Sequence, residues 1–221
     1  MEKIINITLD GPGGSGKTTI ARELAKNLGI AYLDTGAMYR GVAYYMITHG
    51  IDVADVDNVL LHLNDFTLKV VNDNNVQKIL INDEDVSGLI RTQEISMGAS
   101  TVSKIKEVRL KLVEMQREIA KISSCVLDGR DIGSFVLPDA EFKFYLTADV
   151  DVRAKRRYLE QKAKGLEVTI EQVKQEMIAR DEQDSKRAFA PLVVPTGAFV
   201  IDTSNMSIND VLELILSRIK N

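Results

Sequence analysis

The chain has 221 residues, of which 45% are hydrophobic and 27% charged, so it can bury one sizeable core and form one or two domains. Its net charge of −4 argues against a protein that coats nucleic acid or an anionic membrane. The single cysteine, Cys125, excludes a disulfide within the chain, and no apolar run reaches the roughly 20 residues that span a bilayer. We therefore expect a cytoplasmic globular protein, monomeric by default, with neither nucleic acid nor membrane as a partner.

Five apolar runs of strand length alternate with helical patterns. They cover residues 4–10, 30–34, 124–128, 142–148 and 198–203. This alternation predicts an α/β fold, with a parallel sheet covered by helices on both faces. Three runs end in Asp, at Asp10, Asp34 and Asp128, so we expect these carboxylates at the carboxyl edge of the sheet, where open α/β folds bind ligands.

Several stretches show apolar residues at helical spacing. One covers residues 20–28 and stops at Gly29, a second covers residues 105–119, and a capping box at Thr169 and Gln172 opens a third. The last helix is expected to begin after Ser207 as its cap. Its predicted buried stripe is Ile208, Val211, Leu212, Ile215 and Ile219.

The first apolar run leads into the loop GPGGSGKTT, which a helical pattern follows. Residues 11–18 match the P-loop pattern G-x-x-x-x-G-K-[ST] between a strand and a helix, the context that this motif requires. Its backbone N–H groups and the helix N-terminus can wrap the phosphates of a nucleoside triphosphate, with Lys17 at the terminal phosphates and Thr18 on Mg²⁺. The residues expected to bind this nucleotide are Gly11, Pro12, Gly13, Gly14, Ser15, Gly16, Lys17, Thr18 and Thr19.

Two other strand ends carry residues suited to a second phosphate. After Asp34, Thr35 opens a helix that carries Arg40, and a helix start beside an arginine is a phosphate site. In VLDGRDIG, residues 126–133, Asp128 could organise Mg²⁺ through water, as a Walker B carboxylate does. The charged residues Arg130 and Asp131 follow where a plain turn would more often use Gly, Asn or Ser.

Residues 66–88 break the alternation of strands and helices. Two β-rich runs there are joined by Asn-Asp-Asn-Asn at residues 72–75 without a helix between them, which predicts a hairpin. The resulting antiparallel insert is either a flap on the substrate side or a surface insertion without a role, and the sequence favours neither.

Two neighbouring helical patterns carry a concentration of arginines. Such runs are usually solvated surfaces, but two convergent groups in an acidic protein also fit a lid that neutralises two polyanionic substrates and excludes water. The residues are Arg153, Arg156 and Arg157 on the first pattern, and Arg180, Asp184 and Arg187 on the second.

The motifs DGPGGSGKTT, LDTGAMYRG, VSGLIRTQE, LDGRDIG and ARDEQDSKRAFAPL occur in this order, and together they resemble the bacterial cytidylate kinases of the nucleoside monophosphate kinase group. The resemblance runs the whole chain. It implies a five-stranded parallel P-loop core at residues 1–34, 101–150 and 188–221. A monophosphate-binding region would cover residues 35–100, with the insert at about 63–90, and an arginine-bearing lid residues 151–187. It also implies phosphoryl transfer from ATP to CMP or dCMP with Mg²⁺.

The resemblance further implies roles for individual residues. Thr35, Arg40, Arg130 and Arg187 would contact the acceptor, mainly its phosphate. Ser100, Arg109 and Asp131 would read the cytosine edge, whereas Arg180 and Asp184 would contact the sugar and phosphate. Arg153, Arg157 and Arg180, with Lys17, would stabilise the transferring group. The chain departs from the family pattern at Thr18, where many relatives have Gly, and at Gln183, which replaces a common lid arginine.

Two other readings stay open. A P-loop kinase with a hydroxyl acceptor, of the shikimate or dephospho-coenzyme A type, would need a carboxylate base, for which Asp34 or Asp131 could serve. A nucleotide-gated binding protein would close its lid on ATP and show no dependence on a monophosphate. An acceptor phosphate needs no base, because its second pKa of about 6 leaves the attacking oxygen anionic near neutral pH.

Overall fold

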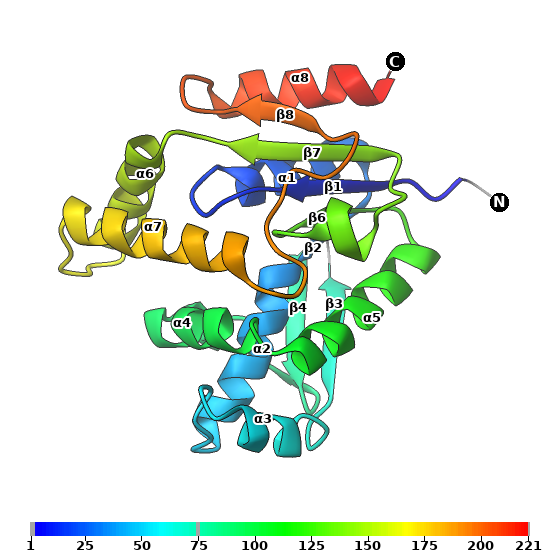
Figure 1. The fold of residues 1–221 in the computed structure, drawn as a ribbon. Helices are drawn as coiled ribbons and strands as arrows, with labels where there is room; N and C mark the ends of the chain where they lie inside the picture. The colour runs from blue at the N-terminus through cyan, green and yellow to red at the C-terminus, as the bar shows by residue number, and fades with distance from the viewer. Residues whose placement is uncertain (1–2, 74–75, 221) are drawn as a thin grey trace. The chain divides into compact units, whose positions relative to one another are not determined.

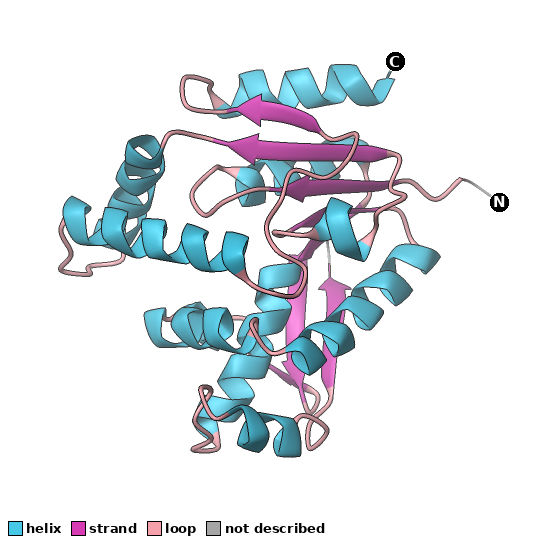
Figure 2. Ribbon diagram, in the orientation of Figure 1, coloured by secondary structure: helices cyan, strands magenta, loops and turns pink. Residues whose placement is uncertain are grey.

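The computed structural model describes residues 3–73 and 76–220, and it has an α/β fold with two sheets (Figures 1 and 2). The larger sheet has five strands in the order β2-β6-β1-β7-β8. Its strands are β1 (Asn6–Asp10), β2 (Ala31–Asp34), β6 (Cys125–Asp128), β7 (Phe142–Thr147) and β8 (Phe199–Asp202). Strand β7 pairs in parallel with both β1 and β8. The predicted five-stranded parallel sheet is confirmed, and each strand lies within its predicted run.

Contacts within the chain divide it into two compact units. The first unit comprises Ile30–Cys125 with Lys3 and Ile4. Its elements after β2 are α2 (Thr35–Thr48), α3 (Val56–His62), β3 (Leu68–Asp73), β4 (Val76–Ile81), β5 (Glu84–Asp85), the 3₁₀ turn η1 (Leu89–Arg91), α4 (Gln93–Val102) and α5 (Lys106–Ile122).

The second unit comprises Ile5–Gly29 and the chain from Val126 onward. Besides its strands it contains α1 (Lys17–Leu28), the π-helical turn η2 (Ile132–Val136), α6 (Val150–Ala163), α7 (Ile170–Lys186) and α8 (Ile208–Lys220). The inner positions of its strands are fully buried, including Ile7, Leu9, Leu127 and Leu146. Strands covered on both faces need apolar residues on both sides, which is why they appear in the sequence as continuous apolar runs.

The predicted antiparallel insert is confirmed in the first unit. Strand β3 pairs antiparallel with β4, with Leu68 opposite Ile81, and β4 pairs with the short strand β5. The predicted turn at residues 72–75 includes Asn74 and Asn75, which lie outside the described residues. Two residues are too few to show a period, so β5 has no signal in the sequence.

The helix signals are confirmed with one exception. Gly29 ends α1 in the left-handed region at φ 66°, and Thr169 and Gln172 form the predicted capping box of α7. The Ser207 hydroxyl accepts from the backbone N–H of Asp210 at 3.2 Å, as expected of a cap. The prediction that Ile208 is buried is wrong, because the first residue of α8 is 52% exposed at the helix start.

Among the residues described, no helix is both long enough and apolar enough to cross a membrane.

Candidate active site

The P-loop joins the end of β1 to the start of α1 in the second unit. Gly11 adopts φ 145°, and a β-carbon there would lie 2.0 Å from the carbonyl oxygen of Leu146, so only glycine fits. Gly14 and Gly16 also have positive φ, at 73° and 88°, and Gly16 is the N-cap of α1. The predicted loop therefore has the backbone geometry that phosphate binding requires.

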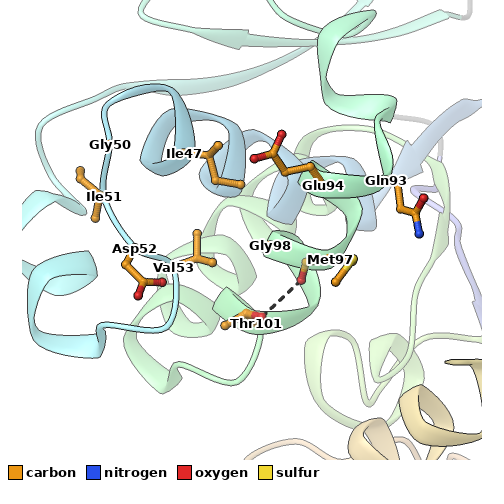
Figure 3. A pocket seen from close by; sticks show the side chains of 10 residues that line it. All are labelled: Ile47, Gly50, Ile51, Asp52, Val53, Gln93, Glu94, Met97, Gly98 and Thr101. Atoms are coloured by element: carbon orange, nitrogen blue, oxygen red, sulfur yellow. Dashed lines mark hydrogen bonds between the residues drawn. The ribbon is translucent and has the colours of Figure 1, made fainter.

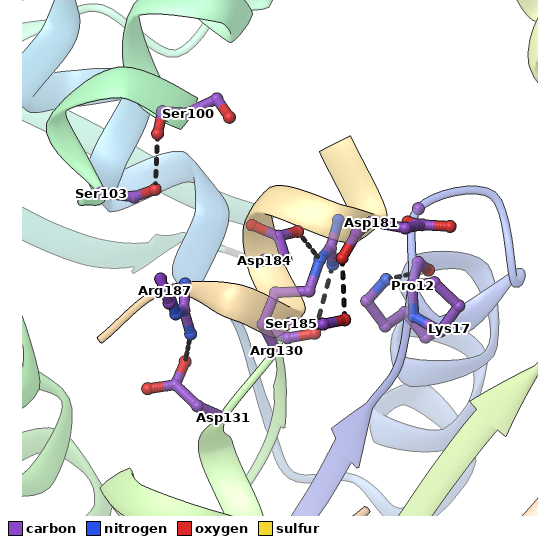
Figure 4. A network of polar contacts seen from close by, with 12 residues as sticks. Pro12, Lys17, Ser100, Ser103, Arg130, Asp131, Asp181, Asp184, Ser185 and Arg187 are labelled. Carbon is purple, nitrogen blue, oxygen red and sulfur yellow. Dashed lines mark hydrogen bonds and ion pairs between the residues drawn. The ribbon is translucent and has the colours of Figure 1, made fainter. Parts of the chain in front are cut away.

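Lys17 lies buried at the start of α1, where its Nζ donates to the carbonyl oxygen of Pro12 at 2.9 Å (Figure 4). Burial first, and then the positive charge of Arg130, lowers the pKa of Lys17 to about 7, against the opposing effect of Asp128. A polyphosphate beside this amine would favour its charged form. A bound polyphosphate would thus add to the effect of Asp128 and Asp184, whose charges already favour the charged amine.

Thr18 and Asp128 meet beside the loop. The Thr18 hydroxyl donates to Asp128 Oδ2 at 2.7 Å, which joins the first turn of α1 to the end of β6. Both side chains offer oxygen atoms, the donors that Mg²⁺ prefers, and this ion commonly takes its remaining ligands from phosphates and water. The pair fits the predicted Mg²⁺ role of these two residues.

Two arginine–carboxylate pairs connect the loop after β6 with α7 and the residue that follows it (Figure 4). Arg130 Nε donates to Asp184 Oδ2 at 2.9 Å, and an Arg187 guanidinium nitrogen lies 3.2 Å from Asp131 Oδ1. Burial acts to raise the pKa of Asp184, but the charges of Arg130, Arg180 and Arg187 outweigh it and lower that pKa. The structure therefore gathers five of the predicted acceptor residues into one charged cluster.

Asp10 anchors the loop that carries this cluster. Its carboxylate is fully buried and accepts from the backbone N–H groups of Ile132 and Gly133, both at 2.7 Å. A β-carbon on Gly133 would lie 2.7 Å from Thr8 Oγ1, so glycine is needed where the backbone of η2 comes close to β1. The sequence placed Asp10 at the sheet edge, but its anchoring role depends on the π-helical turn η2, which has no sequence signal.

The arginines of α6 lie in two different environments. Arg153 is 7% exposed and donates to the carbonyl oxygens of Ala148 and Gly13, at 2.8 and 3.2 Å, and to Asp181 at 2.5 Å. Arg157 pairs with Glu160 of its own helix at 2.9 Å and keeps 36% of its side chain exposed. Arg153 is therefore held against the P-loop backbone, while Arg157 lies on a half-exposed helix face.

Arg156, expected only as one of the lid arginines, and Thr203, expected only as the end of the last apolar run, both contact the P-loop. Arg156 donates to the Thr203 carbonyl oxygen at 2.7 Å and lies 3.5 Å from the carbonyl oxygen of Gly14. The Thr203 hydroxyl donates to the carbonyl oxygen of Ser15 at 3.0 Å. These contacts support the outer side of the P-loop. Arg156 was visible at helical spacing from Arg153, whereas nothing in the sequence indicated that Thr203, which follows β8, contacts the P-loop.

In the first unit, Asp34 organises the start of α2. Its Oδ1 accepts from the backbone N–H of Ala37 at 2.9 Å, and its Oδ2 accepts from Arg40 at 2.8 Å. Thr35 follows as a buried residue, and a β-carbon on Gly36 would lie 3.2 Å from Asp34 and 3.3 Å from Arg40. The predicted helix start and arginine are thus held together by one carboxylate.

Ser100 and Arg109 also belong to one cluster of the first unit. Arg109 of α5 is 1% exposed, donates to the carbonyl oxygen of Ser103 at 3.2 Å and lies over the ring of Tyr39, 5.6 Å from its centre. The Ser103 hydroxyl donates to the carbonyl oxygen of Ser100 at 2.8 Å (Figure 4). A buried, fixed guanidinium beside an aromatic ring suits recognition of a planar base.

A surface depression of about 670 Å³ lies elsewhere in the first unit, between the end of α2 and α4 (Figure 3). Its lining includes Ile47, Asp52, Glu94 and Met97, and it contains none of the predicted site residues.

A family model described as cytidylate kinase matches residues 7–221 of the chain. The cytidylate kinase of Caldicellulosiruptor saccharolyticus is 48% identical over 216 residues, which cover 97% of this chain and 95% of that protein. The cytidylate kinase of Halalkalibacterium halodurans is 42% identical over 218 residues, which cover 99% of this chain and 98% of that protein. An uncharacterized protein from Eubacterium ventriosum has a crystal structure with a TM-score of 0.57 at 14% identity, covering 98% of this chain and 99% of that one. That last likeness concerns the fold alone.

Proposed function

Because the chain belongs to the cytidylate kinase family, we propose that it transfers the γ-phosphoryl group of ATP to CMP or dCMP, giving ADP and CDP or dCDP. One observation carries this proposal within the second unit. A buried P-loop lysine, Lys17, lies in the electrostatic field of Arg130 and Arg180, next to the Thr18–Asp128 pair. A site with donor-phosphate groups and further arginines beside them suits transfer between two phosphorylated molecules.

On the donor side, residues 11–19 would hold the β- and γ-phosphates of ATP through their backbone N–H groups, which all of them except Pro12 possess. Thr18 would bind Mg²⁺ directly, and Asp128 would bind it through a water molecule. Mg²⁺, when bound, neutralises charge on the phosphate oxygens. Lys17 would regain its proton as the phosphates arrive and then stabilise the charge that develops on the transferring group.

On the acceptor side, we assign the phosphate of CMP to Thr35, Arg40, Arg130 and Arg187. Ser100, Arg109 and Asp131 would read cytosine, and Arg180 and Asp184 would contact the sugar and phosphate. The carboxylates that pair with these arginines support the assignment, because a guanidinium that is already oriented loses less side-chain freedom when a phosphate binds.

The lid arginines would act at the transferring group. Arg180 contributes to the field at Lys17, which supports a role there. Arg157 would have to leave Glu160 to reach a phosphate, and its half-exposed side chain has the freedom to do so. Arg153 would act from its position on the P-loop backbone, where it contacts the carbonyl oxygen of Gly13.

The hydroxyl-acceptor alternative is weakened by the contacts of its two candidate bases. Asp34 and Asp131 both lie in ion pairs, with Arg40 and Arg187 respectively. A general base needs a free lone pair directed at the substrate hydroxyl. Arginines held by carboxylates match an acceptor phosphate better than an acceptor hydroxyl.

The test is ADP formation from Mg·ATP with CMP, dCMP, UMP, AMP, GMP, shikimate or dephospho-coenzyme A added singly. We expect strong stimulation by CMP and dCMP alone, with CDP or dCDP as the product. Equal rates with and without every acceptor would contradict the proposal and favour the nucleotide-gated binding protein.

A further inference from the structure

Gln77 of the antiparallel insert is bonded to the end of β2. Its Oε1 accepts from the backbone N–H of Asp34 at 2.5 Å, and its Nε2 donates to the carbonyl oxygen of Asp34 at 3.2 Å. Among the strands that the structure describes, β2 stands at the edge of the five-stranded sheet, so one of its sides has no neighbouring strand. The Gln77 amide supplies both the acceptor and the donor that a neighbouring strand would otherwise offer at this residue.

Asp34 is the residue through which this contact reaches the site. Its backbone is held by Gln77, while its carboxylate caps α2 through Ala37 and pairs with Arg40. A β-carbon on Gly36 would lie 3.2 Å from Asp34 Oδ1, so the carboxylate has little room to shift on that side. A change in the backbone at Asp34 would therefore move the group that orients Arg40.

The insert is also firmly attached to the helix that carries Arg40. A β-carbon on Gly41 of α2 would lie 3.0 Å from Ile79, 3.1 Å from Leu68 and 3.5 Å from Ile81, all of which belong to the insert. These apolar residues are buried, whereas the neighbouring Val76 is 61% exposed. Apolar packing thus fixes the insert on α2, and Gln77 is its polar contact with the end of β2.

We propose that Gln77 is a positioning residue for the acceptor phosphate, acting through Asp34 on Arg40. The inference rests on the proposed function, because it requires Arg40 to bind the phosphate of a nucleoside monophosphate. It gives the antiparallel insert a role in acceptor binding, which is the first of the two readings that the sequence left open. The insert then acts on substrate affinity without Gln77 itself touching the substrate.

The first test compares Gln77→Ala and Gln77→Glu with the unaltered protein, and Val76→Ala is the matched control on the same strand. Dissociation constants for CMP and Mg·ATP are measured by calorimetric titration, together with kcat, KM and Tm. Two lost hydrogen bonds should weaken CMP binding about tenfold in Gln77→Ala and leave the affinity for Mg·ATP unchanged. Val76→Ala should match the unaltered protein in all of these quantities.

Gln77→Glu separates the local contact from the packing of the insert. Glutamate has nearly the same shape and can still accept from the Asp34 N–H, but its second oxygen faces the Asp34 carbonyl oxygen instead of donating to it. Weaker CMP binding at an unchanged Tm is the expected result. A lower Tm with unchanged affinity for CMP would mark a merely structural contact and overturn the inference.

A double-mutant cycle with Arg40→Ala tests whether the effect passes through Arg40. If it does, Gln77→Ala should weaken CMP binding in the unaltered background and change it little once Arg40 is absent. An equal loss in both backgrounds would overturn the inference. CMP binding by the unaltered protein keeps the two proposals distinct. If the unaltered protein does not bind CMP, the proposed function is wrong. If it binds CMP and Gln77→Ala binds it equally well, only the role of Gln77 is wrong.

Discussion

The lowered pKa of Lys17 predicts that ATP affinity depends on pH. Burial and the charge of Arg130 bring this pKa to about 7, from an ordinary value of 10.5. The amine of the free protein is then mostly charged at pH 6, half charged at pH 7 and mostly neutral at pH 8. Because the phosphates bind the charged form, each binding event at pH 8 must first take up a proton. The dissociation constant for Mg·ATP should therefore rise about tenfold between pH 6 and pH 8.

The assay is calorimetric titration of Mg·ATP without an acceptor at pH 6, 7 and 8, in buffers with different ionisation enthalpies. Proton uptake on binding should increase over this range, because the nucleotide restores the charge of Lys17. Lys17→Met is the control, since methionine keeps an unbranched side chain but cannot bind a proton. Its affinity for Mg·ATP should be weaker, and it should lack the pH dependence that the titration of Lys17 causes. An affinity of the unaltered protein that is constant from pH 6 to pH 8, or an equal slope in Lys17→Met, would refute the reasoning.

Further predictions concern four residues of the second unit. Lys17→Ala should lower kcat by about two orders of magnitude or more, and near-normal turnover would contradict the role assigned to Lys17. The Tm should not fall, because burial of the amine has an electrostatic cost that the variant does not have. Asp131→Ala should weaken CMP binding far more than ATP binding in the same titrations, and a parallel fall would make its role structural. Arg157→Ala should lower kcat more than it raises KM for CMP, whereas the reverse pattern would mark a ground-state contact. Burial raises the pKa of Asp10 from 3.8 to about 6 in the folded protein. The resulting gain in stability is complete below pH 3.8, the pKa of Asp10 in the unfolded chain, and is lost as pH rises through 6. Relative to Asp10→Asn, the unaltered protein should lose about 2 kcal/mol of unfolding free energy between pH 4 and pH 7, and parallel denaturant curves over that range would contradict this.

The fold was predictable wherever a segment is a short continuous apolar run or repeats apolar residues at helical spacing. All five strands of the larger sheet were readable because buried parallel strands are short apolar runs, and the insert was readable because two such runs flank a turn. The predictions from the sequence failed where such a pattern is absent or where it ends. Ile208 continues the apolar stripe of α8 but lies at the exposed helix start, and η2 depends on the buried Asp10, which reaches it from β1.

The sequence named the residues of the candidate site, and their roles stay predictions, but it did not show the contacts among them. The P-loop motif identified Lys17 and Thr18, since it specifies them by position along the chain, and Asp128 was identified because it ends a strand. The bonds of Gln77 to Asp34 join residues 43 positions apart, and only the folded insert brings them together. A glutamine in an alternating strand has no feature in the sequence that separates a positioning role from ordinary solvation.

The proposed function requires an acidic chain to bind two polyanions, and the ion pairs at the candidate site suit that task. With a net charge of −4, the chain does not attract nucleotides over its whole surface, so it must concentrate positive charge locally. Guanidinium groups repel one another when they are gathered together, and carboxylates placed between them offset that repulsion before a substrate arrives. In the second unit the pairs are Arg130–Asp184, Arg153–Asp181 and Arg187–Asp131. The first unit has the separate pair Arg40–Asp34. A phosphate that binds to such a cluster meets oriented donors whose charge is already partly balanced. Removal of one carboxylate should therefore disturb the orientation of its arginine more than it increases the attraction for phosphate.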